Sequence, residues 1–473
     1  MAFKKKLHAF RPSNEPPTIF TRRTKRLQRR EPCDPASIER GVRQRLADKV
    51  SGTMVGLWLL IPEHLRLGTW DLLCGWTQCQ GDQVQPRLAL QAVHEAALCL
   101  PRFRRDTGLT QKGLELANGL PFIATDQAIH DLFDASTIEQ TQGLQMALGR
   151  LRRARGHFLA KLLAVDPHHR RSYTQRQTRR HRHKEGEAAV KTLQTIFCLD
   201  AHTHQPVAFT IASAARTTSQ AVPELLDMAR DILQPPPRQT LVIADNEHLT
   251  ADIFQHVLQD SPFDLLSPMP RGRSDQERLA RIPPDLFVPR WAGLAIARLP
   301  YQFHRNPLGP LYQLVQRCGE TPDNYHYAPF LSTSQNDELD LLCRDYPDRW
   351  HIEEFFNAYQ AMGWNRAGTL NLHIRYAQLT MALIAQAALH QLRQRLGEPY
   401  QDWEAGRLSK LLLQGLDGDI RVDDNTVLVT FYNAPNAERL RQHYENLPHK
   451  LQAEHVNPTV PWLYGYKLDF RFK

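Results

Sequence analysis

The sequence predicts an α/β protein with a mixed β-sheet, a helical N-terminal region before the sheet and a β-rich insertion within it. Three observations support this prediction. Apolar residues recur at three- and four-residue spacings from about 35 to 156, as in amphipathic helices. From about 160, short apolar runs alternate with helical segments. Residues 271–340 hold three strand-like runs separated by Pro, Gly and Asn turns.

The composition is typical of a globular protein. The chain has 473 residues, of which 42% are hydrophobic and 23% are charged, and this balance excludes wholesale disorder. No run of 18 uncharged apolar residues occurs, so we expect no membrane span and no membrane partner. The N-terminus lacks an apolar signal core, and the seven cysteines form no CxxC pair. We therefore expect a cytoplasmic, nucleoid-associated protein without a structural zinc site.

Positive charge is concentrated in two segments of the chain. Residues 1–30 hold ten basic residues and one acidic residue, which gives +9. Residues 150–187 hold twelve basic and three acidic residues, again +9, so the other 405 residues sum to −9. A solubilising tail and an exposed loop would also be basic. Two separate clusters favour a polyanionic partner, and we expect nucleic acid.

The chain divides into six predicted regions. They are a basic disordered tail (1–30), a helical DNA-binding region (31–156), the first part of the core (157–270), a β-strand insertion (271–340), the second part of the core (341–400) and a C-terminal region for dimerisation or DNA contact (401–473). Within the helical region, Thr125 is a predicted helix N-cap.

The core has a recognisable order of elements: strand, strand, strand, helix, strand, helix, strand. The first three strands can form an antiparallel meander, whereas the later ones need crossover helices. This is the ribonuclease H-like order. The predicted strands are Lys161–Asp166, Thr192–Asp200, Pro206–Ser213, Leu241–Asp245 and Phe263–Ser267, and the helices are Gln220–Leu233, Leu249–Leu258, Asp345–Met362 and Asn371–Gly397.

Three carboxylates stand out by position in this layout. Asp166 and Asp245 each end a predicted strand, and Glu353 lies on the helix after the insertion. If the two strands are parallel neighbours, both aspartates lie at one edge of the sheet, whereas Asp200 lies at the opposite edge. Three carboxylates are hard oxygen ligands suited to Mg²⁺ or Mn²⁺. The alternative is that the aspartates are ordinary turn residues at strand ends.

The segment around Glu353 resembles a known family. Tyr346, Arg349 and Glu353 have the spacing Y-x2-R-x3-E, which is similar to the YREK signature of DDE transposases from bacterial insertion sequences, in the cut-and-paste branch. The sequences LAVDPH around Asp166 and VIADNEH around Asp245 also resemble the first two acidic motifs of that family. The resemblance covers about 157–400 in organisation.

The resemblance implies a set of roles. The three carboxylates would hold two divalent ions, and the protein would cut transposon ends and join them to target DNA as a homodimer. Arg349 would contact DNA phosphates, and Tyr346 would touch the backbone near the cleavage site; a helix-start packing and salt-bridge pair is the alternative. Trp291 would stack on a displaced base, unless it packs the insertion. The family's lysine is replaced by Gln360, which puts its phosphate contact in doubt.

Two other features have functional interpretations. Arg170 and Arg171 lie in a predicted basic loop, 167–191, which we expect to face DNA. His202 and His204 form an HxH pattern next to Asp200, which could bind zinc but lies in a predicted turn. Two alternatives to a transposase remain open: a domesticated or inactive transposase that only binds DNA, which Gln360 favours, and a structure-selective nuclease on the same core.

Overall fold

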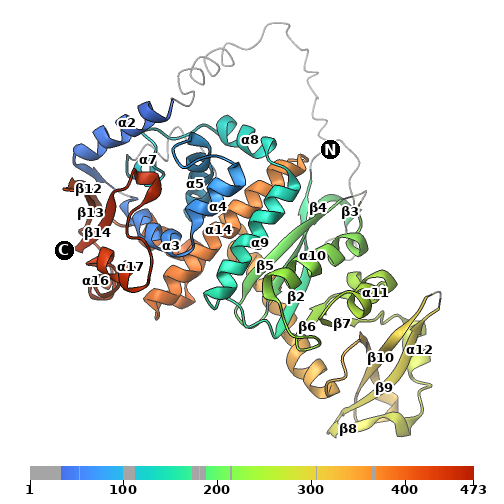
Figure 1. Cartoon of the computed structure of the whole chain (residues 1–473). Helices are drawn as coiled ribbons and strands as arrows, with labels where there is room; N and C mark the ends of the chain where they lie inside the picture. The colour runs from blue at the N-terminus through green and yellow to red at the C-terminus, as the bar shows by residue number, and fades with distance from the viewer. Residues whose placement is uncertain are drawn as a thin grey trace, which may run out of the picture.

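The computed structural model describes residues 34–52, 54–99, 112–172, 180–181, 188–213, 216–304, 306–363 and 369–473. The chain forms a mixed α/β fold with N-terminal helices and one large mixed sheet, which confirms the predicted fold class (Figure 1). Within these ranges no helix combines the length and hydropathy that crossing a bilayer requires. The basic tail 1–30 lies outside the described residues, and the predicted region boundaries stay predictions.

The large sheet has ten strands, in the order β3-β4-β2-β6-β7-β11-β10-β9-β8, with β5 paired to β4. The β2, β4 and β5 strands pair antiparallel, whereas β2, β6 and β7 pair parallel, as the sequence predicts. The strands are β2 (Leu162–Arg171), β3 (Arg180–His181), β4 (Val190–Asp200), β5 (Gln205–Ala212), β6 (Leu241–Ala244), β7 (Asp264–Pro268), β8 (Val288–Trp291), β9 (Leu294–Phe303), β10 (Asn306–Cys318) and β11 (His326–Ser332).

Helices cover both faces of this sheet. On one face, Leu163 and Val165 of β2 share a buried cluster with residues of α10 (Thr218–Leu233) and α11 (Ala251–Gln259). On the other face, Leu162 and Ala164 share a cluster with residues of α13 (Trp350–Tyr359) and α14 (Leu372–Leu396). Because side chains alternate along a strand, Asp166 belongs to the face that α13 and α14 cover.

The β-rich insertion extends the main sheet. Strand β11 pairs with β7, so β8 to β11 continue the sheet to its outer edge (Figure 1). The three predicted strands are present. Strand β8 and helix α12 (Arg273–Leu279) are short and were not predicted. A separate small cluster of Leu279, Phe287, Ala295, Ala297 and Val315 packs this region.

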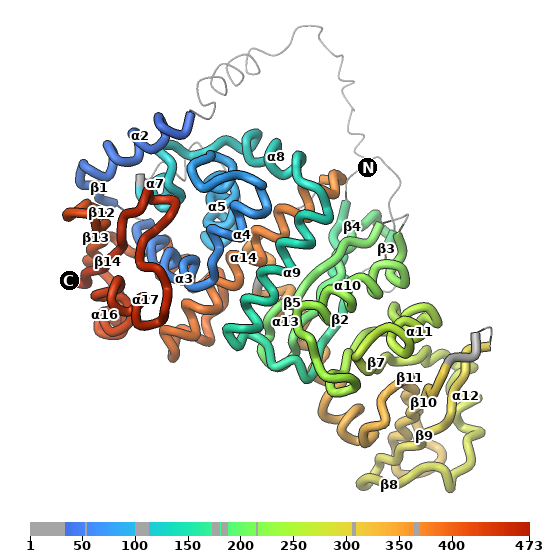
Figure 2. The backbone as a smooth tube through the Cα atoms, in the orientation of Figure 1, coloured from blue at the N-terminus to red at the C-terminus, as the bar shows by residue number. Residues whose placement is uncertain are grey.

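The first and last parts of the described chain form one unit. Strand β1 (Val50–Gly52) pairs with β12 in a second sheet, β1-β12-β13-β14, and Figures 1 and 2 show the blue N-terminal helices beside the red C-terminal elements. The elements are α2 (Pro35–Ala47), α3 (Ile61–Arg66), α4 (Thr69–Thr77), α5 (Val84–Ala97), α7 (Lys112–Ala117), α8 (Asp126–Ala135), α9 (Ile138–Ala154), β12 (Gly418–Asp423), β13 (Thr426–Phe431), α16 (Ala437–Tyr444), α17 (Leu447–Ala453) and β14 (Lys467–Phe472). Thr125 caps α8, as predicted, because its side chain accepts from the Ala128 N–H at 3.2 Å.

A buried polar network joins these two parts. The Arg66 guanidinium donates to both carboxylate oxygens of Glu454, at 2.6 and 3.0 Å, and to Glu63 at 3.0 Å. The Tyr444 hydroxyl donates to the same Glu63 oxygen at 2.8 Å, and Arg395 of α14 lies 3.3 Å from it. Bidentate, charge-assisted bonds of this kind are stronger than neutral ones. The network therefore fixes α3 against α14 and the C-terminal helices.

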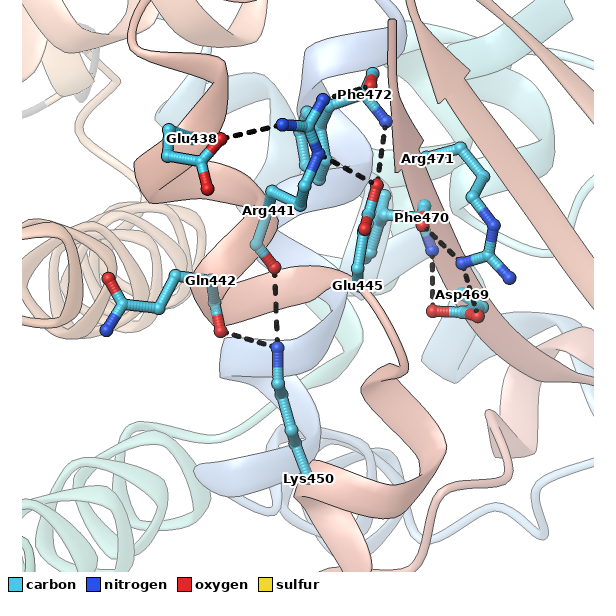
Figure 3. Close-up of polar contacts among 9 residues, drawn as sticks. All are labelled: Glu438, Arg441, Gln442, Glu445, Lys450, Asp469, Phe470, Arg471 and Phe472. Atoms are coloured by element: carbon cyan, nitrogen blue, oxygen red, sulfur yellow. Dashed lines mark hydrogen bonds and ion pairs between the residues drawn. The ribbon is translucent and has the colours of Figure 1, made fainter.

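A second set of polar contacts closes the C-terminal unit (Figure 3). Arg441 of α16 donates to the Phe472 carbonyl of β14 at 2.7 Å and pairs with Glu438 at the same distance. The Phe472 N–H donates in return to Glu445 at 3.3 Å. These bonds satisfy backbone groups at the edge of β14, so the final strand is fastened to the helix that covers it.

The contact between α9 and α10 gives a test of packing. A Cβ atom at Gly149 of α9 would lie 2.7–2.8 Å from Ile232 of α10, whereas one at Gly143 of the same helix would meet nothing within 4 Å. We expect Gly149→Ala to lower the free energy of unfolding by about 1–2 kcal/mol, because overpacking outweighs the gain in helix propensity. The control Gly143→Ala should raise it by about 0.5–1 kcal/mol. Urea titration measures both, and equal effects would contradict this packing.

Candidate active site

Asp166 and Asp245 occupy neighbouring positions on two parallel strands. Val165 of β2 pairs with Ala244 of β6, and each is followed by an aspartate. Asp245 follows its strand, as predicted. Asp166 does not end its strand, and that prediction was wrong: β2 continues to Arg171, paired with β4 from Thr192 onward. Basic side chains resemble a loop in the sequence, but here they extend a β-ladder whose hydrogen bonds do not depend on side-chain charge.

Aromatic packing docks the helix that carries Glu353 onto the face of the sheet that carries Asp166. Phe197 of β4 lies directly opposite Asp166, so both side chains lie on the face that α13 covers. The Phe197 ring lies 5.7 Å from that of Phe355 and 5.5 Å from that of Phe356. Phe197 and Phe355 are buried, and this contact docks α13 onto the sheet. Glu353 precedes these aromatic residues by two and three positions on α13, and its charge acts on Asp166.

Arg349 joins two of the three carboxylates. It ends the short helix η6 (Tyr346–Arg349), which leads into α13. Its Nη2 donates to Oε1 of Glu353 at 2.9 Å, and its Nη1 lies 3.7 Å from Oδ1 of Asp166. The predicted phosphate-binding arginine therefore contacts the acidic residues themselves, where it supplies the positive charge that a group of carboxylates needs.

The electrostatic environment acts most strongly on Asp166. Burial, followed by the negative charge of Asp245, raises the pKa of the Asp166 carboxyl to about 7. The charges of Arg349 and His248 act in the opposite direction, and Glu353 adds to the rise. A carboxyl in this setting binds a proton readily near neutral pH, and a nearby cation would favour its ionised form.

Asp245 is held in place by local hydrogen bonds. It caps the short helix η2 (Asn246–His248), with its Oδ1 accepting from the Glu247 N–H at 3.0 Å and lying 2.7 Å from Nδ1 of His248. The Ser267 hydroxyl of β7 donates to the Asp245 carbonyl at 2.8 Å. His248 is buried and had no predicted role. The Asp-x-x-His spacing at a strand end was the available signal, because it places an imidazole within reach of the cap.

Tyr346 lies beside this group, as its spacing from Arg349 suggested. Its ring packs against that of Phe330, with the ring centres 4.9 Å apart. Burial raises the pKa of its hydroxyl; the charge of Arg349 lowers this pKa, and the charge of Asp245 raises it. Trp350, the residue after Arg349, is 57% exposed although it is a large apolar residue.

The other predicted DNA contacts lie at different distances from the carboxylates. Gln360 begins η7 (Gln360–Met362), directly after α13. Arg170 and Arg171 extend β2 beyond Asp166. Trp291 is exposed on β8, the outermost strand, six strand positions from β2. At about 4.8 Å per strand that is roughly 29 Å, so the structure does not bring Trp291 to the carboxylates.

Asp200 is the last residue of β4, and its side chain stabilises the turn that follows the strand. It is fully buried, and its two carboxylate oxygens accept four backbone N–H groups, from Leu159, Ala160, His202 and Thr203, at 2.7–3.2 Å. The ring of His204 lies 4.1 Å from that of His351. Asp200 therefore organises a turn, and both histidines of the HxH pattern are exposed.

The oxygen atoms of the three acidic side chains are the kind of ligand that divalent cations prefer. All are carboxylates, which suit Mg²⁺ and Mn²⁺, and Arg349 marks a position where positive charge is stabilised. Among the residues that the structure describes, no group of three His, Cys, Asp or Glu residues is gathered closely enough to hold a metal ion. Glu353 is engaged with Arg349 in this arrangement.

Comparison with known proteins identifies the part of the chain that carries these residues. Residues 157–387 match the family model of the transposase DDE domain, from just before β2 into α14. This part of the chain is therefore similar to the transposase DDE domain. A cryo-EM structure of the piggyBac transposase synaptic complex with hairpin DNA is similar over 78% of this chain and 82% of that chain, with 10% identity and a TM-score of 0.39, which is too low to support an argument. The curated proteins searched contain no match.

The ion pairs of Arg349 give a test of the acidic group. In Arg349→Gln the carboxylates lose their counter-charge, so we expect a melting temperature about 2–4 °C below wild type without metal. Millimolar Mg²⁺ should then raise the melting temperature of the variant more than that of the wild type. The control is Arg344→Gln, which removes an exposed arginine paired with Asp340 and Asp345. An identical Mg²⁺ response in both variants would contradict this role.

Proposed function

We propose that the protein is a DNA transposase that binds transposon ends, cleaves phosphodiester bonds and transfers 3′-hydroxyl ends to target DNA with divalent metal ions. The observation that supports this most directly is that Asp166 and Asp245 follow paired residues of two parallel strands, while the helix that carries Glu353 packs on the face of the sheet that carries Asp166. The match of residues 157–387 to the transposase DDE domain supports the same conclusion.

In this proposal Asp166, Asp245 and Glu353 would hold two Mg²⁺ ions, or Mn²⁺ in their place. When bound, such ions activate a nucleophilic oxygen and stabilise the leaving oxygen in phosphodiester chemistry. His248 orients Asp245 through its 2.7 Å contact. Arg349 releases Glu353 and turns to a DNA phosphate, for which a guanidinium is a bidentate donor. Tyr346, packed on Phe330, limits how closely the DNA backbone approaches.

The basic residues of the chain support double-stranded DNA as the substrate, and the proposed joining of two transposon ends supports a dimer. The basic tail, Arg170 and Arg171 would contact phosphates of double-stranded DNA, and the helical region 31–156 would read the terminal sequence. We propose a homodimer on DNA, one subunit for each transposon end. Residues 401–473 serve dimerisation or DNA contact in this proposal.

A second candidate is a DNA-binding protein without catalysis, and one observation favours it. Gln360 stands where the resemblance implies a lysine, so this position carries no positive charge to bind a DNA phosphate. A structure-selective nuclease on the same core is a third candidate, since the same carboxylates would cut DNA without joining it.

The role of Glu353 separates catalysis from binding. We expect Glu353→Gln to lose Mg²⁺-dependent cleavage of end DNA by at least about 100-fold while end binding is retained, because the side chain keeps its size and loses its charge. The matched control is Glu354→Gln, the exposed neighbour on the same helix, which should cleave like the wild type. Cleavage at wild-type rates by Glu353→Gln would overturn the catalytic assignment. A strand-transfer assay with a free 3′-hydroxyl end, run on the same proteins, distinguishes a transposase from a nuclease.

A further inference from the structure

Strand β2 continues beyond Asp166 and carries an arginine, Arg170, on the face of the sheet that carries Asp166. The alternation of side chains places His168 and Arg170 on that face. The ring contact of His168 with Phe356 of α13, at 4.7 Å, agrees with this placement. The β2 strand therefore leads from the carboxylates to a group of basic side chains beneath α13 and α14.

Helix α14 contributes a buried arginine at the same place. Arg375 lies near the N-terminus of this 25-residue helix and is only 4% exposed. Its Nη2 lies 3.5 Å from the hydroxyl of Thr195, which is the residue of β4 directly opposite His168. Side chains of helices lean toward the N-terminus, so the guanidinium reaches the sheet beside Arg170.

The two guanidinium groups have unused hydrogen-bond donors. Nε of Arg375 and Nη1 of Arg170 are both buried and lack a hydrogen-bond partner among the residues that the structure describes. Burial, followed by the positive charge of Arg170, lowers the pKa of Arg375 to about 10. A buried cation that lies near a second, half-buried cation is unfavourable unless an anion compensates the charge. The helix N-terminus nearby adds partial positive charge.

We propose that Arg170 and Arg375 form a binding site for one phosphate of the DNA backbone, separate from the phosphate that is cut. Four residues along β2 place Arg170 about 13 Å from Asp166, which a DNA strand crosses within a few nucleotides. This proposal rests on the proposed function for the identity of the anion. It assigns a binding role to Arg375, which the sequence alone did not suggest.

The anion site itself is tested without DNA or metal. The probe is inorganic phosphate added to the full chain, with chloride at equal ionic strength as the reference, and the readout is the melting temperature. We expect phosphate to raise the melting temperature of the wild type by about 2–4 °C and to leave that of Arg170→Gln/Arg375→Gln unchanged. If the double variant does not fold, the single variant Arg170→Gln, at a half-buried position, is measured in its place. The control Arg273→Gln removes the same charge from an exposed position on α12 and should respond like the wild type.

The assignment to DNA is tested by salt dependence. The slope of log affinity against log salt for duplex DNA should decrease in magnitude by about 0.9 in Arg170→Gln/Arg375→Gln, as expected for one lost phosphate contact. A phosphate response that is absent in the wild type, or equal in wild type and variant, would overturn the site. A lost phosphate response with an unchanged slope would mean that the site binds free phosphate and would overturn the DNA assignment. Neither readout requires cleavage, so failure of the proposed function would be seen separately, as a wild type that binds DNA but does not cut it.

Discussion

The pairing of β2 with its two neighbours determines the position of every residue in the candidate site. Its parallel ladder with β6 brings Asp166 level with Asp245, and its antiparallel ladder with β4 puts Phe197 across from Asp166. A shift of one residue in either register would move Asp166 to the face covered by α10 and α11. The buried alternation of Leu163 and Val165 against Leu162 and Ala164 prevents such a shift, because both faces are packed.

Bringing carboxylates together creates the main electrostatic problem of this fold. The structure meets it in two ways: Asp166 binds a proton more readily than usual, and Arg349 places its guanidinium between Asp166 and Glu353. The same problem with the opposite sign occurs four residues along β2, where the charge of Arg170 acts on Arg375 and each guanidinium has one donor without a partner in the part of the chain that the structure describes. One group gathers negative charge and the other gathers positive charge, which agrees with the proposed metal and phosphate sites.

The sequence predicts the elements well and the side-chain contacts poorly. The order of strands, the position of Asp245 and the Thr125 cap depend on local patterns, and these predictions were confirmed. The extension of β2 past Asp166 depends on pairing with β4, which no local pattern of charged residues indicates. The pairing of β1 with β12 joins residues over 350 positions apart, as in Val50 with Ile420, and is equally invisible to local periodicity. The contacts of Arg349 and the burial of Arg375 follow only from how α13 and α14 dock.

The central claim is that Asp166 and Asp245 share one metal site, whereas Asp200 only organises a turn. The most direct measurement is the affinity of the full chain for Mn²⁺. Electron paramagnetic resonance reports it, because the signal of free Mn²⁺ is lost when the ion binds. The account predicts that Asp166→Asn and Asp245→Asn each lose Mn²⁺ binding by about tenfold or more, because each removes a charged oxygen ligand. It also predicts that Asp200→Asn, confirmed to be folded, binds Mn²⁺ like the wild type. Undiminished Mn²⁺ binding by Asp166→Asn, or its loss in folded Asp200→Asn, would contradict the account.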